Sequence, residues 1–326
     1  MRTIQQLLPE EWKAFEQSFE QALDTDQVTL QEVLHYIHLQ RGKQLRPQLV
    51  LLSAAISRGV TDKTISTAVA LELLHTATLV HDDVVDHSPM RRGKAAIQEQ
   101  WTNKVAVLVG DYILAKVIEM IDDLRCHSIV HLVAKMGQVL SKGELSQLHA
   151  GQSMWISEKQ YFDIIHQKTA ELFGTCAQAG AQSCLATGKQ EQALRTFGIN
   201  LGMCFQLKDD ILDYSDSEEL GKPTMNDIRD GKVTLPLIIS LQRATKDEAA
   251  AIRKQAEALC AQEDGKTTDI QEDIKSFVLR YQGVNYAYKK MEEYRRKAMD
   301  ALTIFRESEF KQALLDMLDY AIRRER

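Results

Sequence analysis

The sequence predicts an all-α protein, and three observations support this fold class. Only 16 glycines and 5 prolines occur among 326 residues, which favours long helices because these residues punctuate regular structure. Helix-compatible patterns cover most of the chain, and no run of alternating polar and apolar residues is long enough to be a strand. Hydrophobic residues make up 44% of the chain, enough for a sizeable core. Because no low-complexity linker or composition break divides it, we expect a single domain over residues 1–326.

The expected helices follow one another along the chain. Pro9 opens the first, with Glu10 and Glu11 near the positive end of the helix dipole. Helical patterns then cover residues 30–39, 47–57, 63–86, 95–122, 128–151, 157–187, 190–213, 235–244, 246–263, 270–305 and 307–323. Two polar loops, residues 86–94 and 214–234, each follow an acidic motif and contain glycine, proline and basic residues.

Charge and cysteine content limit the class of protein. The formal net charge of −6 argues against nucleic acid as the main partner, because binding to a phosphate backbone needs a basic surface. The five cysteines form no Cys-x-x-Cys pair and are odd in number, so we expect reduced thiols in a cytoplasmic protein. The N-terminus shows no apolar signal segment. No apolar stretch reaches the ~18 residues of a membrane span.

The most informative feature is a short acidic pattern that occurs twice. Residues 82–86 read Asp-Asp-Val-Val-Asp and residues 209–213 read Asp-Asp-Ile-Leu-Asp, each after an apolar, helix-compatible run. Aspartate is a poor helix former and is rarely buried unpaired, so these clusters need a chemical reason. Mg²⁺ prefers oxygen ligands and is commonly held by carboxylates together with substrate phosphates. The repeat therefore predicts several Mg²⁺ ions around a diphosphate, with ligands drawn from Asp82, Asp83, Asp86, Asp209, Asp210 and Asp213.

Helical spacing places polar residues on one face in both regions. Residues three, four and seven apart share a helix face, which aligns Gln206 with Asp209, Asp210 and Asp213. His75 lines up with Asp82 and Asp86 in the same way. We expect the two stripes to line one cavity. Basic residues near the motifs are candidates for phosphate contacts: Lys43, Arg46, Arg91, Arg92, Lys168, Lys222 and Lys232.

Several segments together resemble the trans-isoprenyl diphosphate synthases of the polyprenyl synthetase family. The matching segments run in family order over most of the chain: GKQLRP (42–47), ELLHTATLVHDDVVD (72–86), RRGK (91–94), GDYILA (110–115), KTAELF (168–173), FQLKDDILD (205–213) and GKPTMNDIRDGKVTLP (221–236). The resemblance implies an all-helical bundle around a deep central cavity, usually in a homodimer. It also implies repeated addition of isopentenyl diphosphate to an allylic diphosphate, farnesyl or similar.

The resemblance also implies roles for individual residues. Asp82, Asp86 and Asp209 would ligate Mg²⁺, with the other three aspartates in support, directly or through water. Isopentenyl diphosphate would be held by Lys43, Arg46, His75 and Arg92. The allylic diphosphate would be contacted by Arg91, Lys168, Thr169, Gln206, Lys222 and Lys232, of which Lys168 and Gln206 are also expected to take part in catalysis. The chain departs from the family pattern at residues 95–98 and 141–143.

The expected chemistry is ionisation, condensation and elimination. Mg²⁺ and basic side chains would stabilise the charge that leaves on diphosphate, and apolar walls would keep water from the allylic carbocation. The released diphosphate would accept the proton. Because the prenyl product would be strongly apolar, we also expect a transient membrane contact for its release.

Product length is predicted from the residues before the first motif. Short-chain enzymes of the family place a bulky aromatic at the fourth or fifth residue before the first aspartate, where this chain has Thr78 and Ala77. We therefore expect a long product, octaprenyl-like, that would serve as a quinone side chain. The tunnel floor is expected among Ile113, Leu114, Val117 and Met136.

Four alternatives remain open. A shorter-chain farnesyl or geranylgeranyl synthase would use the same motifs. Glu32-x-x-His35 and Glu72-x-x-His75 resemble the pairs of a di-iron carboxylate bundle. A terpene cyclase would share the first acidic motif but not the second, and a non-catalytic partner subunit would tend to lose the aspartates. His127 and His131 could ligate zinc, but with no third ligand nearby we interpret them as surface residues.

Overall fold

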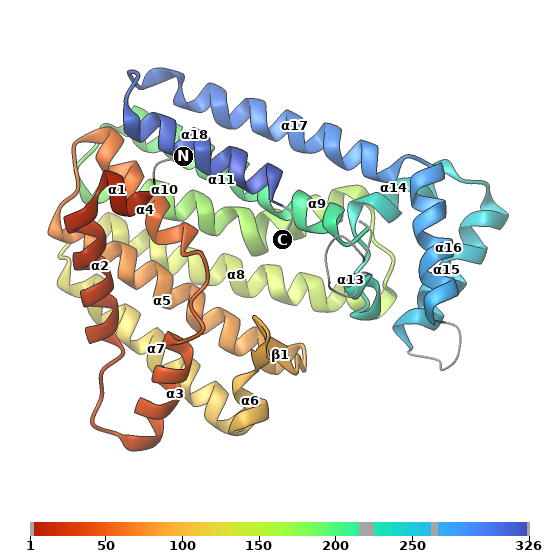
Figure 1. Cartoon of the computed structure of the whole chain (residues 1–326), viewed down its shortest axis with the longest axis horizontal. Coiled ribbons are helices and arrows are strands. Elements are labelled where there is room, and N and C mark those ends of the chain that lie inside the picture. The colour runs from red at the N-terminus through yellow and green to blue at the C-terminus, as the bar shows by residue number, and fades with distance from the viewer. Residues whose placement is uncertain (1–2, 215–224, 262–266, 325–326) are drawn as a thin grey trace. The chain divides into compact units, whose positions relative to one another are not determined.

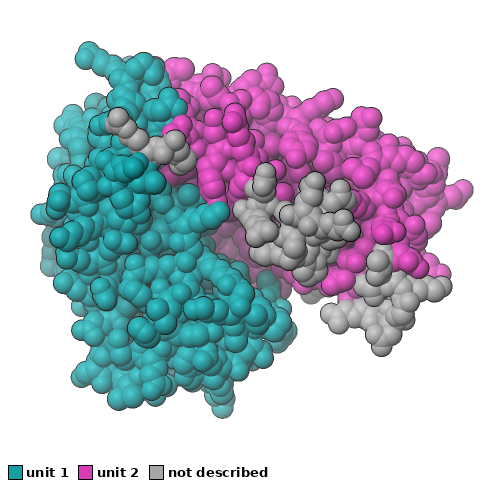
Figure 2. All heavy atoms as spheres, in the orientation of Figure 1, with its two compact units in different colours: residues 1–135, 175–195, 304–314 teal, residues 136–174, 196–303, 315–326 magenta. Residues whose placement is uncertain are grey.

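The computed structural model describes residues 3–214, 225–261 and 267–324, and these residues form an all-α protein (Figure 1). By their internal contacts they form two compact units, coloured separately in Figure 2. Unit 1 comprises residues 1–135, 175–195 and 304–314, and unit 2 comprises residues 136–174, 196–303 and 315–326. Each unit is assembled from three stretches of chain, so no single linker separates them. The expectation of one domain over the whole chain stays a prediction.

Unit 1 is built on a long helix that ends in the first acidic motif. Its first helices are α1 (Ile4–Leu7), α2 (Pro9–Ala22), α3 (Val28–His38), α4 (Leu45–Ser57) and α5 (Asp62–Val85), followed by α6 (Ile97–Gln100) and α7 (Asn103–Asp123). Helix α5 packs against α4 and α7. Gly110 makes the α7 contact close, because a Cβ there would stand 2.2 Å from Nε2 of His81 on α5. The expected start of the first helix at Pro9 is confirmed.

The boundary between the units falls within four helices: α8 (His127–Ser153), α10 (Glu171–Ser183), α11 (Gly188–Leu212) and α18 (Glu309–Arg323). Unit 2 also contains α9 (Glu158–Ile165), a π-helical turn (His166–Ala170), α13 (Asn226–Arg229), α14 (Leu235–Arg243), α15 (Lys246–Cys260), α16 (Thr267–Arg280) and α17 (Gly283–Ala301). The boundary also falls within the 3₁₀ turn Leu302–Ile304. Within this unit α14 packs on α17, and α15 packs on α16.

Three of the expected helices are wrong in their continuity. The expected helix 95–122 is interrupted at Trp101, and Thr102 caps the start of α7 by accepting a hydrogen bond from the Val105 amide at 3.2 Å. The expected helix 157–187 is interrupted by the π-helical turn and ends at Ser183. The expected helix 270–305 breaks at Gln282, whose φ of 55° is left-handed. No proline marks these breaks, and the apolar pattern continues across them. The sequence pattern therefore did not indicate the interruptions.

The expectation of no strand is also wrong, although only slightly. Met90–Arg91 (β1) pairs antiparallel with Lys94–Ala95 (β2) inside the segment predicted as a loop. The two residues between the strands, Arg92 and Gly93, have positive φ values of 53° and 77°. Two such residues form the tight turn whose twist matches a β-hairpin. A two-residue strand is too short to show an alternating pattern.

Two further expectations concern redox state and membranes. All five cysteines lie among the described residues and all are free thiols. Across the described residues, no helix has the length and apolar content needed to cross a bilayer. The cytoplasmic location stays a prediction.

Candidate active site

The first acidic motif forms the last turn of α5. Asp82 and Asp86 are half-buried, one helical turn apart, whereas Asp83 is buried with 5% exposure. Asp83 accepts hydrogen bonds from Arg91 Nε at 2.9 Å and also from Arg91 Nη2. This paired geometry is the strongest form of an arginine–carboxylate contact. Asp83 therefore anchors the hairpin arginine.

The hairpin also sets the direction of Arg92. A non-glycine residue in the left-handed region is uncommon and carries a conformational cost. Here that conformation, φ 53°, accompanies a hydrogen bond from Arg92 Nη1 to the Gln40 carbonyl oxygen at 2.5 Å. The two consecutive arginines thus point to different partners, Arg91 to the motif and Arg92 to the chain before α4.

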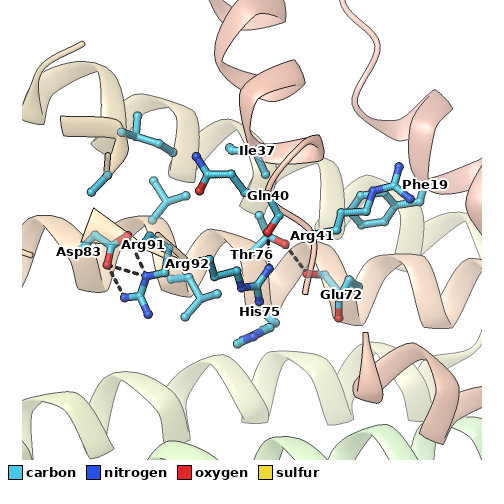
Figure 3. Close-up of a pocket in the computed structure, with 14 residues that line it drawn as sticks. Phe19, Ile37, Gln40, Arg41, Glu72, His75, Thr76, Asp83, Arg91 and Arg92 are labelled. Carbon is cyan, nitrogen blue, oxygen red and sulfur yellow. Dashed lines mark hydrogen bonds and ion pairs between the residues drawn. The ribbon is translucent and has the colours of Figure 1, made fainter. Parts of the chain in front are cut away.

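A cavity in unit 1 brings these arginines together with His75 (Figure 3). It is lined by Phe19, Ile37, Gln40, Arg41, Glu72, His75, Thr76, Leu79, Val80, Asp83, Arg91, Arg92, Ala96 and Ile97. In Figure 3 the guanidinium of Arg92 lies next to His75, and that of Arg41 lies alongside the ring of Phe19. The Arg41–Phe19 distance is 4.8 Å from Cζ to the ring centroid. His75, Arg91 and Arg92 were predicted here from the sequence, and Arg41 and Glu72 were not.

The electrostatics of this cavity suit a multivalent anion. Burial raises the pKa of Glu72, and the charges of Arg46, Arg92 and Arg41 oppose that rise. Burial lowers the pKa of His75 well below its usual value, and the neighbouring arginines lower it further. The imidazole is therefore neutral at pH 7. The lining has two carboxylates, Glu72 and Asp83, and three guanidinium groups, so the cavity is net positive. Arginine binds phosphate oxygens in pairs.

The second acidic motif ends α11 and belongs to unit 2. Asp210 is buried, with 2% exposure, and its carboxylate accepts hydrogen bonds from the Tyr161 hydroxyl and from Gln206 Nε2, the latter at 2.9 Å. Gln206 Oε1 in turn accepts a hydrogen bond from Thr169 Oγ1 at 2.8 Å. The sequence predicted Gln206 and Thr169 as site residues but gave no signal for Tyr161, which lies on another helix.

Asp209 has a cationic partner that sequence reasoning missed. Arg324, at the C-terminal end of α18, stands 2.7 Å from Asp209 Oδ1. Its guanidinium lies 3.7 Å above the Phe205 ring and donates to the Phe205 carbonyl oxygen at 2.7 Å. The Arg324 side chain is 8% exposed and that of Asp209 43%. Arg324 thus pairs with one oxygen of a carboxylate whose side chain stays partly exposed.

Asp213 and Asp227 add two more carboxylates to the second motif. Asp213 accepts hydrogen bonds from the backbone amides of Asn226 at 3.1 Å and Asp227 at 3.2 Å. Burial raises the pKa of Asp227 well above its usual value, and the charges of Asp210 and Asp213 raise it further. Burial likewise raises the pKa of Asp210 to about 7, against the hydrogen bonds from Tyr161 and Gln206. These carboxylates resist full ionisation unless a cation joins them.

The π-helical turn carries two predicted residues, Lys168 and Thr169. Lys168 Nζ lies 2.7 Å from Glu144 Oε2 on α8. Gly143 lets the two helices approach, because a Cβ there would stand 3.2 Å from the Lys168 backbone nitrogen. The departure from the family pattern at residues 141–143 therefore lies against the π-helical turn. Single π-helical turns inside α-helices occur frequently at functional sites.

Other predicted residues have less defined surroundings. Lys43 is exposed and does not line the cavity. Lys232 Nζ is 3.7 Å from Asp230 Oδ2, and Lys222 lies outside the described residues. Ala77 is fully buried and Thr78 half-buried, and neither lines the cavity of Figure 3. The residues predicted for the tunnel floor belong to both units. Met136 is buried and belongs to unit 2, whereas Ile113, Leu114 and Val117 belong to unit 1. Ile113 and Val117 are buried, and Leu114 is half-buried.

The donor set can be compared with what a metal needs. Among the residues whose side chains the structure describes, no three His, Cys, Asp or Glu side chains gather closely enough to hold a metal ion by themselves. This weighs against a di-iron site at Glu72 and His75, where the neighbours are arginines. His127 and His131 are both exposed. The aspartates still fit Mg²⁺, which commonly takes one or two carboxylates and completes its shell with phosphate oxygens and water.

An all-α fold with two Asp-Asp-x-x-Asp helix ends, each beside basic side chains, is typical of prenyltransferases that act on diphosphates. The chain belongs to the polyprenyl synthetase family, whose model matches residues 27–277, and it is therefore a prenyltransferase. The family segments quoted from the sequence run from residue 42 to residue 236, inside the matched range.

Relatives and solved structures agree along the whole chain. It is 35% identical to an octaprenyl diphosphate synthase of Haemophilus influenzae, over 96% of this chain and 94% of the relative. A polyprenyl synthase from Caulobacter crescentus, solved with calcium and isoprenyl diphosphate, matches with a TM-score of 0.90 and 31% identity over 99% of this chain and 97% of that one. A geranylgeranyl pyrophosphate synthase from Bacteroides thetaiotaomicron matches with a TM-score of 0.83 and 36% identity, over 98% of each chain.

Proposed function

We propose that this prenyltransferase condenses isopentenyl diphosphate repeatedly with an allylic diphosphate, farnesyl or similar, and releases a long all-trans polyprenyl diphosphate, octaprenyl-like. The observation that carries the proposal is the pairing of each aspartate-rich helix end with basic side chains: Asp83 with Arg91 and Asp209 with Arg324. The octaprenyl diphosphate synthase relative supports the long product. The similar geranylgeranyl synthase keeps a shorter product as the alternative.

Mg²⁺ would be held by Asp82 and Asp86 at one helix end and by Asp209 at the other. When bound, it would draw negative charge onto the diphosphate and make that diphosphate a better leaving group. Asp83, Asp210 and Asp213 act mainly through their hydrogen bonds to Arg91, to Tyr161 and Gln206, and to the backbone after α11. These three aspartates keep the two acidic motifs in shape. They would support the bound Mg²⁺ either directly or through water.

The remaining residues bind and orient the two substrates. The positive cavity around His75, Arg91 and Arg92 suits one diphosphate, and the charge of Arg46 also acts on His75. Lys168 and Thr169, on the π-helical turn, and Gln206 suit the other. Ala77 and Thr78 leave no aromatic ring beside the first motif, which favours a long product. The neutral imidazole of His75 can donate one hydrogen bond to a phosphate oxygen.

Three further proposals concern the setting of the enzyme. A homodimer, a cytoplasmic location and a transient membrane contact for product release all fit a prenyltransferase whose product is apolar. Analytical ultracentrifugation of the purified chain tests the first. Flotation with phospholipid vesicles, with and without a preformed long-chain product, tests the last.

One incubation tests the proposed function as a whole. The purified chain is given isopentenyl diphosphate, farnesyl diphosphate and Mg²⁺, and the dephosphorylated products are separated by chromatography. We expect polyprenyl alcohols longer than geranylgeraniol. A ladder that stops at geranylgeraniol would favour the short-chain alternative, and a cyclised hydrocarbon would favour a terpene cyclase. Product only after a second protein is added would identify a partner subunit.

His75→Gln is expected to raise KM for isopentenyl diphosphate about tenfold, because the flexible amide does not place its donor where the imidazole N–H meets the phosphate. KM for the allylic substrate is expected to change less than twofold. Steady-state kinetics with each substrate varied in turn measures the two effects. The interpretation would be wrong if both KM values rose equally, or if only the midpoint of thermal unfolding fell.

Mg²⁺ binding is expected to weaken below pH 7 because Asp210 has a raised pKa, about 7. In the metal-free protein this group stabilises the fold most below the unfolded pKa of ~3.9, and that stabilisation is lost as pH rises through about 7. Mg²⁺ prefers the ionised form, which is only about a tenth populated at pH 6. The rise in unfolding temperature on adding Mg²⁺ with inorganic diphosphate should therefore be larger at pH 8 than at pH 6. An equal rise at both values, at matched ionic strength, would contradict this.

A further inference from the structure

The geometry points to Tyr161 as a positioning residue that fixes, through Asp210, the orientation of the Gln206 amide toward a bound diphosphate. This inference deepens the proposed function and rests on it. Nothing in the sequence pattern or in the family comparison assigns a role to Tyr161, which sits on α9 with 3% exposure.

Three hydrogen bonds connect three separate elements of unit 2. The Tyr161 hydroxyl of α9 donates to Asp210 Oδ2, and Gln206 Nε2 of α11 donates to Asp210 Oδ1 at 2.9 Å. Thr169 Oγ1, on the π-helical turn, donates to Gln206 Oε1 at 2.8 Å. We refer to Tyr161, Asp210, Gln206 and Thr169 as the Tyr161 chain. It links α9, the acidic motif and the turn that carries Lys168.

The direction of each hydrogen bond follows from chemistry. Asp210 accepts at both of its oxygens, from Tyr161 and from Gln206, so Gln206 turns its NH₂ group toward Asp210 and its carbonyl oxygen toward Thr169. The NH₂ group has two hydrogens, and Asp210 takes one. The second is left to donate to a phosphate oxygen. Were the amide reversed, its oxygen would repel both Asp210 and a bound diphosphate.

Tyr161 holds the carboxylate that imposes this direction. With its Oδ2 bound to the tyrosine hydroxyl, the buried Asp210 presents Oδ1 to Gln206. Without the hydroxyl, the carboxylate can turn about its last torsion, and the amide loses its fixed partner. Hydrogen bonds to charged groups contribute more than neutral ones, so this contact is strong enough to decide the amide orientation.

Tyr161→Phe tests the inference because it removes only the hydroxyl. We expect KM for the allylic diphosphate to rise about tenfold, and KM for isopentenyl diphosphate to stay within twofold. The stabilisation by Mg²⁺ with inorganic diphosphate, measured as a shift in unfolding temperature, should shrink. This second measurement needs no turnover.

Tyr286→Phe is the matched control. Tyr286 also donates from its hydroxyl to a carboxylate, Glu158 Oε1 at 2.6 Å, and Glu158 begins the same helix α9. The control removes a tyrosine–carboxylate hydrogen bond of the same kind, away from the acidic motif. It should leave both KM values and the diphosphate-induced shift unchanged.

A double-mutant cycle separates action through Gln206 from a general loosening of the fold. If Tyr161 acts by orienting the amide, Tyr161→Phe should add less than twofold to KM in a Gln206→Met background, because interacting residues are not additive. The inference would be overturned if the two substitutions raised KM independently, so that the double variant showed the product of the two single effects. It would also be overturned by a Tyr161→Phe enzyme with normal KM and only a lower unfolding temperature. Should Tyr161→Phe not fold, Gln206→Met alone must still raise the allylic KM, and a normal value would overturn the inference.

Failure of the proposed function gives a different result. In that case the wild-type chain would form no prenyl product. The thermal shift with Mg²⁺ and inorganic diphosphate would still compare Tyr161→Phe with Tyr286→Phe, and equal shifts in the two variants would overturn the role of Tyr161.

Discussion

Asp82→Ala and Asp209→Ala are each expected to lower turnover by at least ~10²-fold, comparable to the loss of one strong electrostatic contact to the transition state. Asp82 is half-buried in the last turn of α5, so its removal should leave the fold intact. Turnover of purified variants at saturating Mg²⁺ and substrates measures the effect. Normal turnover in either variant would contradict the proposed mechanism.

Asp209 needs a second variant because of Arg324. Removing the carboxylate leaves a guanidinium with 8% exposure without its ionic partner, and an uncompensated buried charge is strongly destabilising. Asp209→Asn keeps an oxygen for Arg324 but is a weaker Mg²⁺ ligand, so it should lose activity with a smaller loss of stability than Asp209→Ala. Asp122→Ala, at a carboxylate with 69% side-chain exposure on α7, is the control and should retain both.

Ala77→Phe is expected to shorten the product while condensation continues. Ala77 is fully buried in α5, and a packed interior cannot absorb an aromatic ring without displacing its neighbours. If the growing chain passes this side of α5, the ring should block it about one and a half helical turns, ~7.5 Å along the helix, from Asp82. Chromatography of the products against wild type gives the chain lengths.

Overpacking alone is controlled with Ala68→Phe. Ala68 is also fully buried in α5, but it lies nine residues from Ala77, about two and a half turns, so it faces the opposite side of the helix. Both variants should be less stable by about 1–3 kcal/mol, measured by chemical denaturation. Only Ala77→Phe should shorten the product. An unchanged product from Ala77→Phe would mean that the growing chain does not pass this residue.

The fold class and both acidic motifs could be predicted from the amino-acid sequence alone. Low glycine and proline content and helical apolar spacing act within a few residues of each other, so they can be recognised without a structure. The helix that ends in the first motif was expected at 63–86 and is found at Asp62–Val85. His75 and Arg92, predicted together for one substrate, line one cavity with Arg91.

Only the tertiary structure decided which groups hold these residues in place. Arg324 contacts Asp209 and Tyr161 contacts Asp210 across long stretches of sequence, and no local pattern carries such a pairing. Arg41 joins His75 in the same way, because it follows α3 in the chain and meets α5 only in the folded cavity. The breaks at Trp101 and Gln282 and the π-helical turn also escaped prediction. Helical propensity differs by only a few tenths of a kcal/mol among most residues, so packing decides where a helix bends or ends.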